Sequence, residues 1–234
     1  MKKSSLKSVS WGQRLLSLWR VKLLFEDDEL IVVEKPCGLL TIATEKERSK
    51  TLYAALFDYV KHKRPPEKIF IVHRLDRDAS GLLVFAKTEP AKHHLQQQFK
   101  NHSATRKYVA VAEGRLRRDQ ETIRSFLAEN AAHRVYSVKD SQKGKLAVTH
   151  FSVLKRSSQA TLIEVQLESG RKHQIRVHLA EHGHPILGDK SYGSRRNPLR
   201  RLALHASSLS FSHPGTGQRL QFESPCPNSF LTQL

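Results

Sequence analysis

The sequence predicts an α+β fold, in which a few helices flank a central sheet that is mixed or mostly antiparallel. Several short apolar segments have the composition of strands, and three other segments space their apolar residues as helices do. Short strands that only a few helices interrupt are typical of this fold class. Neither an internal repeat nor a clear linker divides the 234 residues, so we expect one catalytic domain at residues 21–234.

Strands are expected wherever a short apolar run is bounded by glycine, proline or polar residues. The first lies within residues 29–40, is rich in β-branched residues, and is stopped by Pro36 and Gly38. Two further apolar runs, at 69–72 and 81–87, enclose a polar loop. The remaining strands are predicted at residues 107–114, 161–170, 202–211 and 218–225.

Helices are expected in three segments. Residues 51–60 place Leu52 and Leu56 on one helical face. Residues 88–99 begin with Thr88 as a capping residue and have Pro90 in the first turn. Residues 173–183 form a short predicted helix that ends at Gly183.

The charge of the chain indicates a polyanionic partner. Forty Lys and Arg residues face 22 Asp and Glu residues, which gives a formal net charge of +18. Such a field attracts nucleic acid and makes binding depend on salt. Basic runs at residues 61–68 and 194–201, together with a basic N-terminal arm at residues 1–20, could follow phosphates, although charge runs are usually only solvated surface.

Cysteine content and hydropathy restrict the cellular compartment in which the protein is expected. Cys37 and Cys226 are the only cysteines, so no disulfide framework is implied, and both are expected to be thiols in a reducing cytoplasm. No apolar run approaches the roughly 18 residues that would indicate a membrane span. The N-terminus has no apolar core of a secretory signal, although an organelle transit peptide stays possible.

The loop at residues 73–80 contains the first candidate for chemistry. Its carboxylates Asp76 and Asp78 lie beside Arg74 and Arg77, between two strands predicted to be buried. Such a loop is a rigid support for a functional residue. Asp76 could be an ionised nucleophile, or both acids could simply form salt bridges at the surface, which is the more common use of such pairs.

Two other kinds of site are weakly supported. The histidines His173, His178, His182 and His184 cluster in the sequence, but Glu181 is not placed among them to give the pattern of a zinc motif. No glycine-rich phosphate loop or nucleophile elbow is present. We therefore expect no metal and no nucleotide cofactor.

Six blocks, in order, resemble the RluA-type family of RNA pseudouridine synthases. These are FEDDELIVVEKPCGLL, HRLDRDASGLLVFAK, RKYVAVAEG, GKLAVTHFSVL, SGRKHQIRVHLAEHGHPILGDKSYG and RLALHASSLSFSHP, spread from about residue 21 to about residue 227. Ala79 stands where the family's signature usually has Thr, and Glu34 where Asn often precedes Lys-Pro. No segment before residue 21 could house the S4-type RNA-binding domain that many relatives carry.

The resemblance implies a role for each site residue. Asp76 would be the nucleophile that lets the base of a flipped uridine detach, rotate and rejoin through carbon, by attack on the ribose or by proton abstraction. Tyr108 would stack on the uracil and transfer a proton at its C5, and Arg176 would pair with Asp76. The implied substrate-binding residues are His73, Arg74, Arg171, His173 and Leu204.

The implied function is the isomerisation of uridine to pseudouridine in structured RNA, ribosomal or transfer. No cofactor is needed, because an isomerisation consumes nothing. We expect a monomer that binds an RNA stem-loop and no membrane. Two alternatives are a catalytically inactive RNA-binding protein on the same fold, and a metal-dependent nuclease that uses the histidine cluster.

Overall fold

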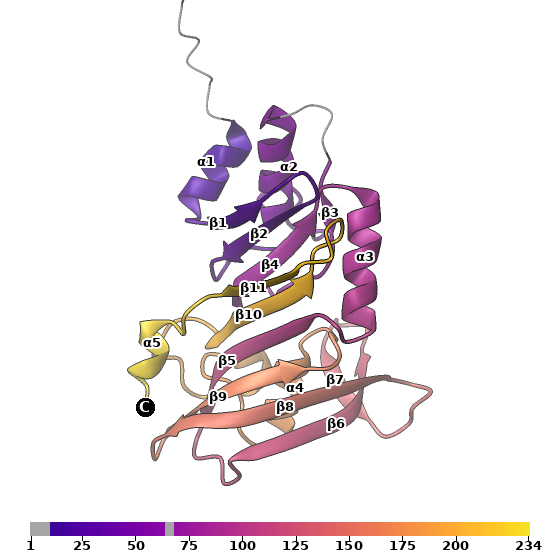
Figure 1. Ribbon diagram of the computed structural model, residues 1–234. Helices are drawn as coiled ribbons and strands as arrows, with labels where there is room; N and C mark the ends of the chain where they lie inside the picture. The colour runs from indigo at the N-terminus through magenta and orange to yellow at the C-terminus, as the bar shows by residue number, and fades with distance from the viewer. Residues whose placement is uncertain (1–9, 64–67) are drawn as a thin grey trace, which may run out of the picture.

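One continuous sheet organises the protein. The computed structural model describes residues 10–63 and 68–234, and in them eleven strands form a single sheet in the order β1-β2-β4-β10-β5-β9-β8-β6-β7, with β3 paired to β4 and β11 to β10 (Figure 1). The strands are β1 (Lys22–Glu26), β2 (Leu30–Lys35), β3 (Phe70–Ile71), β4 (Ser80–Ala86), β5 (Thr105–Glu113), β6 (Gln120–Glu129), β7 (Val135–Val138), β8 (Lys145–Arg156), β9 (Ala160–Leu167), β10 (Leu204–Ser212) and β11 (Arg219–Glu223).

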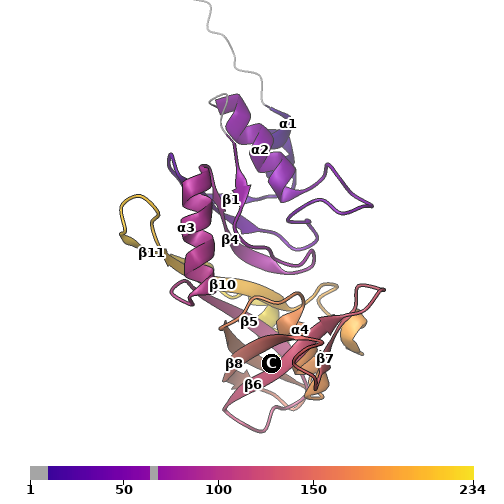
Figure 2. The same ribbon diagram turned by 90° about the vertical axis from the view of Figure 1, so that its right-hand side faces the viewer.

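The predicted sheet type is confirmed. All strand pairs are antiparallel except β4 with β10, so the sheet is mixed and mostly antiparallel. Helices flank it on both sides (Figure 2). They are α1 (Trp11–Leu18), α2 (Leu52–Lys63), α3 (Glu89–Lys100), α4 (Gln174–Glu181) and α5 (Asn228–Leu231), with a 3₁₀ turn at Lys190–Tyr192.

Each of the three predicted helices forms close to its expected bounds. The Thr88 hydroxyl accepts a hydrogen bond from the Ala91 N–H at 3.2 Å and caps α3, and Pro90 occupies its first turn. Gly183 follows α4 with a φ of +80°, a left-handed conformation that stops a helix at low cost for glycine.

Strands β2 and β4 are buried on both faces, which explains their nearly continuous apolar sequences. On one face, Ile31 and Val33 pack in the larger core cluster together with Leu52 and Leu56 of α2. On the other face, Leu30, Val32, Leu82 and Val84 pack against Ala91 and Leu95 of α3. These strands therefore provide a rigid frame for the loop between β3 and β4, which contains Asp76.

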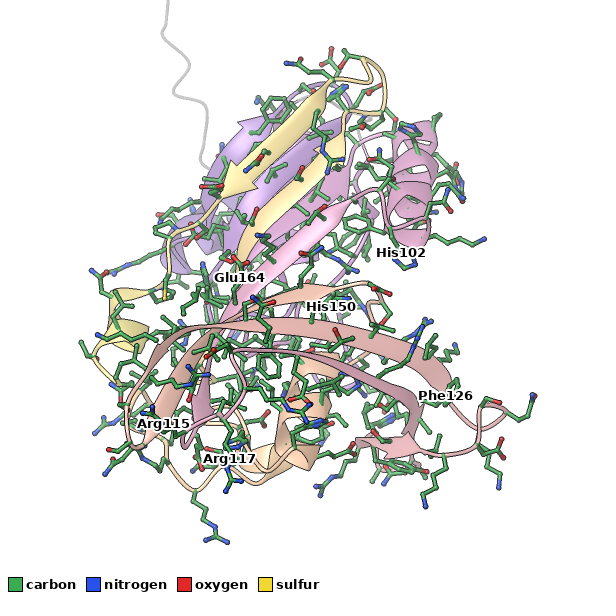
Figure 3. The ribbon with its side chains drawn as sticks, turned by 60° about the horizontal axis from the view of Figure 1, so that its bottom comes forward. His102, Arg115, Arg117, Phe126, His150 and Glu164 are labelled. Carbon is green, nitrogen blue, oxygen red and sulfur yellow. The ribbon has the colours of Figure 1, made fainter. Side chains whose placement is uncertain are left out.

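The other half of the sheet has a more exposed outer face. Figure 3 labels His150 on β8 and Glu164 on β9 there. The Lys107 ammonium donates to Glu164 at 2.9 Å, and the His150 ring hydrogen-bonds with the Glu168 carboxylate at 2.7 Å. Polar pairs of this kind link neighbouring strands, while the inner face of this half packs around α4.

A close approach of strands brings the loop before β4 next to β5. Ala206 of β10 pairs with both Gly81 of β4 and Tyr108 of β5. Gly81 has a φ of +113°, and a Cβ at this position would lie 2.2 Å from the Ala206 carbonyl oxygen. Only glycine allows this contact, so Gly81 fixes where the loop ends relative to Tyr108.

A buried lysine also holds the loop that contains Asp76. Lys35 is fully buried, and its ammonium donates to the carbonyl oxygens of Pro36, Leu39 and Arg77 at 2.9, 2.8 and 3.0 Å. Burial lowers the pKa of Lys35 to about 8. Because one of the three carbonyls belongs to the residue after Asp76, Lys35 ties the turn after β2 to the Asp76 loop.

Some elements differ from the sequence-based expectation. Strands β1, β6, β7 and β8 were not predicted from their residues, because their exposed positions weaken the apolar pattern. Within the predicted N-terminal arm, residues 11–18 form α1, where the Gly12 N–H donates to the Asp58 carboxylate of α2 at 2.6 Å. Residues 1–9 of the arm, and 64–67 of the basic run, lie outside the described residues.

We expect two buried histidines to make the fold sensitive to acid. Burial lowers the pKa of His178 and of His205 to about 4 from the ordinary 6.5. Between these values the unfolded chain binds more protons than the folded one. The free energy of unfolding should therefore fall as the pH drops through this window, by up to about 1.4 kcal/mol per pH unit for each histidine. Urea denaturation across this pH range measures the loss.

The variant His205→Gln tests whether His205 contributes to this dependence of stability on pH. The amide can replace hydrogen bonds to Ser80 and Ser224 but does not titrate, so the dependence on pH should become shallower. The matched control is His94→Gln on the exposed side of α3, which should keep the wild-type dependence. Equal pH dependence in the wild type and in His205→Gln would contradict the prediction.

Candidate active site

A single cavity gathers most of the predicted site residues. About 460 Å³ of space, part of it open solvent, lies between the loop before β4, strand β5, the segment after β9, helix α4 and the start of β10. Its lining includes Asp76, Tyr108 and Arg176 together with Arg74, Arg171, His173 and Leu204, and also Ala79, Arg106 and Gly170. Residues that lie up to 130 positions apart in the sequence thus meet in one site.

The centre of the cavity is an ion pair between Asp76 and Arg176. The guanidinium Nη1 of Arg176 donates to Oδ2 of Asp76 at 3.1 Å. The Asp76 side chain keeps 24% of its surface exposed, whereas that of Arg176 keeps 9%. The carboxylate can therefore be reached by a ligand, while the cation that orients it is held in the protein.

A second carboxylate holds Arg176 from the buried side. Asp189 accepts from Nε of Arg176 at 2.7 Å and from Nη2 at 2.9 Å, a bidentate geometry, and its side chain is 1% exposed. Burial alone would lower the pKa of Arg176, but the hydrogen bonds and charge of Asp189, with the charge of Asp76, raise it above its ordinary value. The guanidinium is thus a permanent cation fixed in one orientation.

Tyr192 and His173 complete the surroundings of the ion pair. The Tyr192 ring lies 4.9 Å from the guanidinium carbon of Arg176, and its hydroxyl hydrogen-bonds with Nδ1 of His173 at 2.8 Å. Nε2 of His173 lies 3.9 Å from Oδ1 of Asp76, and burial lowers the pKa of His173. His173 has a φ of +54°, a strained conformation for a non-glycine residue, of the kind found at functional sites.

Tyr108 forms another wall of the cavity from strand β5. It is 6% exposed, and burial raises the pKa of its phenol, an effect that the charge of Arg106 opposes and that of Asp76 reinforces. The phenol therefore keeps its proton at neutral pH. Leu204 of β10, which pairs with Ala110 of β5, adds an apolar surface to the same cavity.

His73 differs from its predicted place. It is absent from the cavity lining, its Nε2 accepts the backbone N–H of Val84 at 3.3 Å, and its ring centroid lies 4.8 Å from that of Phe99. The His73 side chain thus accepts a backbone N–H of β4 just beyond the residues that pair with the short strand β3. No pattern in the sequence indicates this contact. The geometry gives His73 a supporting position and no direct access to a ligand in the cavity.

Four residues that line or support the cavity were missed by sequence reasoning. Arg106 precedes Tyr108 by two positions, so the period of a strand could have placed both on one face. Asp189, Tyr192 and Lys35 had no such signal, because their roles depend on contacts with distant residues.

The histidine cluster does not assemble a metal centre. Within residues 10–63 and 68–234, no group of three or more His, Cys, Asp and Glu side chains could hold a metal ion. His178 hydrogen-bonds with the hydroxyls of Thr149 and Ser125, and His182 and His184 with backbone carbonyls. Nor is any helix in this part of the chain long and apolar enough to cross a membrane.

We expect Asp189→Asn to destabilise the fold. The amide cannot balance the buried guanidinium of Arg176, so the free energy of unfolding should fall by about 3 kcal/mol. Chemical denaturation measures the change. The matched control is Asp119→Asn, whose carboxylate pairs with Arg156 at 2.6 Å but is 84% exposed, and which should cost less than about 1 kcal/mol. Equal losses for both variants would contradict a special role for Asp189.

Known proteins are similar to this chain in sequence and in fold. A family model described as RNA pseudouridylate synthase matches residues 29–181. Ribosomal large subunit pseudouridine synthase D of Nitrosomonas europaea is 39% identical over 224 residues, which cover 92% of this chain and 64% of that protein. An uncharacterized RNA pseudouridine synthase of Bacillus subtilis is 39% identical over 88% of this chain and 68% of its own length.

The fold has a close counterpart among solved structures. Human RNA pseudouridylate synthase domain containing 4 superposes with a TM-score of 0.75 at 24% identity, over 94% of each chain. At this identity the likeness concerns the fold alone, whereas the family match and the two bacterial relatives concern the sequence. The resemblance seen in the six sequence blocks is therefore confirmed, and the chain belongs to the RNA pseudouridine synthase family, in its RluA-type branch.

Proposed function

We propose that this protein isomerises uridine to pseudouridine in structured RNA, with Asp76 as the nucleophile. The observation that carries the proposal is the Asp76 carboxylate, which is open to the cavity yet oriented by the buried Arg176 at 3.1 Å. Family membership supports the same reaction. The basic chain, with its net charge of +18, suits an RNA substrate.

The isomerisation exchanges one bond of the nucleoside for another. The Asp76 carboxylate bonds to C1′ of the ribose as the bond between C1′ and N1 of uracil breaks, and the bond to Asp76 breaks in turn when C5 attacks C1′. The detached base rotates, its C5 bonds to C1′, and the proton on C5 leaves while N1 gains one. Atoms and electrons balance without a co-reactant, and the carboxylate is regenerated.

Other cavity residues have complementary roles in this proposal. Tyr108 stacks on the uracil, and its neutral phenol takes part in the proton transfer at C5. Leu204 supplies an apolar contact to the base. Arg74, which is exposed on the loop, fills the gap that the flipped nucleotide leaves in the RNA. Arg171 and His173 contact the bound nucleotide from the segment after β9 and from the start of α4.

The names of the relatives bear on the choice of RNA. Several relatives are named for the large ribosomal subunit, which favours a stem-loop of ribosomal RNA over transfer RNA. We propose further that the protein acts as a monomer in the cytoplasm. Both cysteines are free, Cys37 and Cys226, which fits a reducing compartment.

We expect Asp76→Asn to abolish pseudouridine formation, because an amide is no nucleophile. The rate should fall by at least about a thousandfold, the scale on which loss of a nucleophile acts. Purified protein is incubated with total RNA from cells that lack it, and new pseudouridines are mapped by carbodiimide labelling and primer extension. The matched control is Asp78→Asn, two residues along the same loop and exposed, which should keep activity.

The outcomes distinguish a pseudouridine synthase from a catalytically inactive RNA-binding protein. Sites that appear with the wild type and with Asp78→Asn, but not with Asp76→Asn, establish the enzyme and identify its RNA. If wild type and Asp76→Asn bind RNA equally and neither forms pseudouridine, the inactive RNA-binding protein is the correct description.

We expect a chelator to leave the chemistry intact. The proposed steps use only Asp76, Tyr108 and Arg176, so EDTA should not change the single-turnover rate on an RNA that folds without magnesium. A short synthetic stem-loop that contains the mapped uridine serves as substrate, with its folding checked by thermal melting. Loss of activity with EDTA and recovery with zinc would instead support a metal-dependent enzyme.

A further inference from the structure

Arg106 in the cavity wall has the properties of a binding residue for an anionic ligand. Arg106 lines the cavity from β5, and its guanidinium carbon lies 4.9 Å from the centroid of the Phe99 ring. Its Nε is inaccessible to solvent and has no hydrogen-bond partner among the described residues. In the same residues, 10–63 and 68–234, no carboxylate forms an ion pair with Arg106.

The surroundings fix Arg106 in place without neutralising it. A Cβ on Gly170 would lie 2.8 Å from Nη1 of Arg106 and 3.1 Å from Nη2, so glycine leaves the space that the guanidinium occupies. Phe99 provides the face on which the cation lies. The charged group is thus pre-positioned by packing, which lowers the entropy lost when it binds a ligand.

His73 belongs to the same cluster and adds no charge to it. Its ring packs on Phe99, its Nε2 accepts from the Val84 N–H, and its Nδ1 is buried without a partner among the described residues. Burial, and secondarily the charge of Arg106, lowers the pKa of His73 to about 3. His73 is therefore neutral, and it supports the aromatic ring on which Arg106 lies.

The charges around the cavity do not balance. Arg176 has two carboxylates, Asp76 and Asp189, within hydrogen-bond distance. Arg74, Arg106 and Arg171 also line the cavity, and the structure records no described carboxylate paired with any of them. Uracil is neutral at physiological pH, so the base cannot supply the missing negative charge. The phosphodiester groups that flank a flipped nucleotide can supply it.

We propose that Arg106 binds a phosphodiester that flanks the target uridine and so places the ribose over Asp76. The inference rests on the proposed function and goes beyond it, since it assigns one contact on the RNA backbone to one residue. A guanidinium presents parallel N–H donors that match two phosphate oxygens. Of the three unbalanced arginines, Arg74 is exposed on its loop and Arg171 donates its Nε–H to the Leu146 carbonyl, while Arg106 is held by packing alone.

The test pairs a protein variant with a neutral phosphate analogue. Synthetic stem-loops contain the mapped uridine with a methylphosphonate linkage on its 5′ side, on its 3′ side, or on neither. Wild type and Arg106→Gln are compared on each RNA by single-turnover kcat/KM and by its dependence on salt. The control for loss of surface charge is Arg117→Gln, which is exposed in the loop between β5 and β6.

One pattern supports the contact. On unmodified RNA, Arg106→Gln should lower kcat/KM about tenfold to a hundredfold and reduce the salt slope by about 1, since one phosphate contact is lost. On the RNA whose contacted linkage is neutral, wild type should fall to the same level and Arg106→Gln should lose nothing further. Arg106→Lys should recover part of the activity, and Arg117→Gln should match wild type.

Gly170→Ala provides a second variant that keeps every charge. The new Cβ would displace the Arg106 guanidinium, so kcat/KM should fall on unmodified RNA and the effect should vanish on the neutral linkage. If Arg106→Gln loses the same factor on all three RNAs, Arg106 contacts the base or acts only on the fold, and the inference is wrong. If wild type forms no pseudouridine on the unmodified RNA, the proposed function fails first.

Discussion

The site depends on one buried guanidinium shared between two carboxylates. Arg176 lies on α4 and contacts the buried Asp189 on one side and the accessible Asp76 on the other. If Asp76 were the only partner of Arg176, the pair would hold the carboxylate no more firmly than a surface ion pair does, because Asp76 is partly exposed to water. The bidentate contact with Asp189 fixes the cation first, and the cation then orients the reactive acid. The Tyr192 ring and His173 enclose the same group.

The loop that contains Asp76 is held by parts of the chain far from it in sequence. Lys35 donates to the Arg77 carbonyl, and the Thr41 hydroxyl donates to the Leu75 carbonyl at 2.8 Å. These two contacts flank Asp76 on either side. Gly81 then allows β4 to approach β10, which brings Tyr108 of β5 into the same cavity. Backbone contacts of this kind leave the Asp76 side chain free for chemistry.

Much of the architecture could be read from local patterns. The strands β2 and β4 have apolar runs because both of their faces are buried, and α3 has a capping threonine at its start. Strands with one exposed face, such as β6 and β7, carry a weaker signal and were missed. Asp76, Tyr108, Arg176 and four further candidates were gathered from family resemblance, and the structure places them around one cavity. Their chemical roles stay predictions.

The sequence by itself determined the fold class and the basic character of the chain, and the resemblance of its motifs to a family selected Asp76 as the candidate acid in the HRLD loop. These features reside in local patterns and composition, so no contact had to be known. Only the tertiary structure decided that Asp189 balances Arg176, that Arg106 lines the cavity without a paired carboxylate, and that His73 does not line it. Each of these facts is a contact between distant segments, which depends on how β4, β5, β10 and α4 pack together and leaves no mark on the spacing of residues.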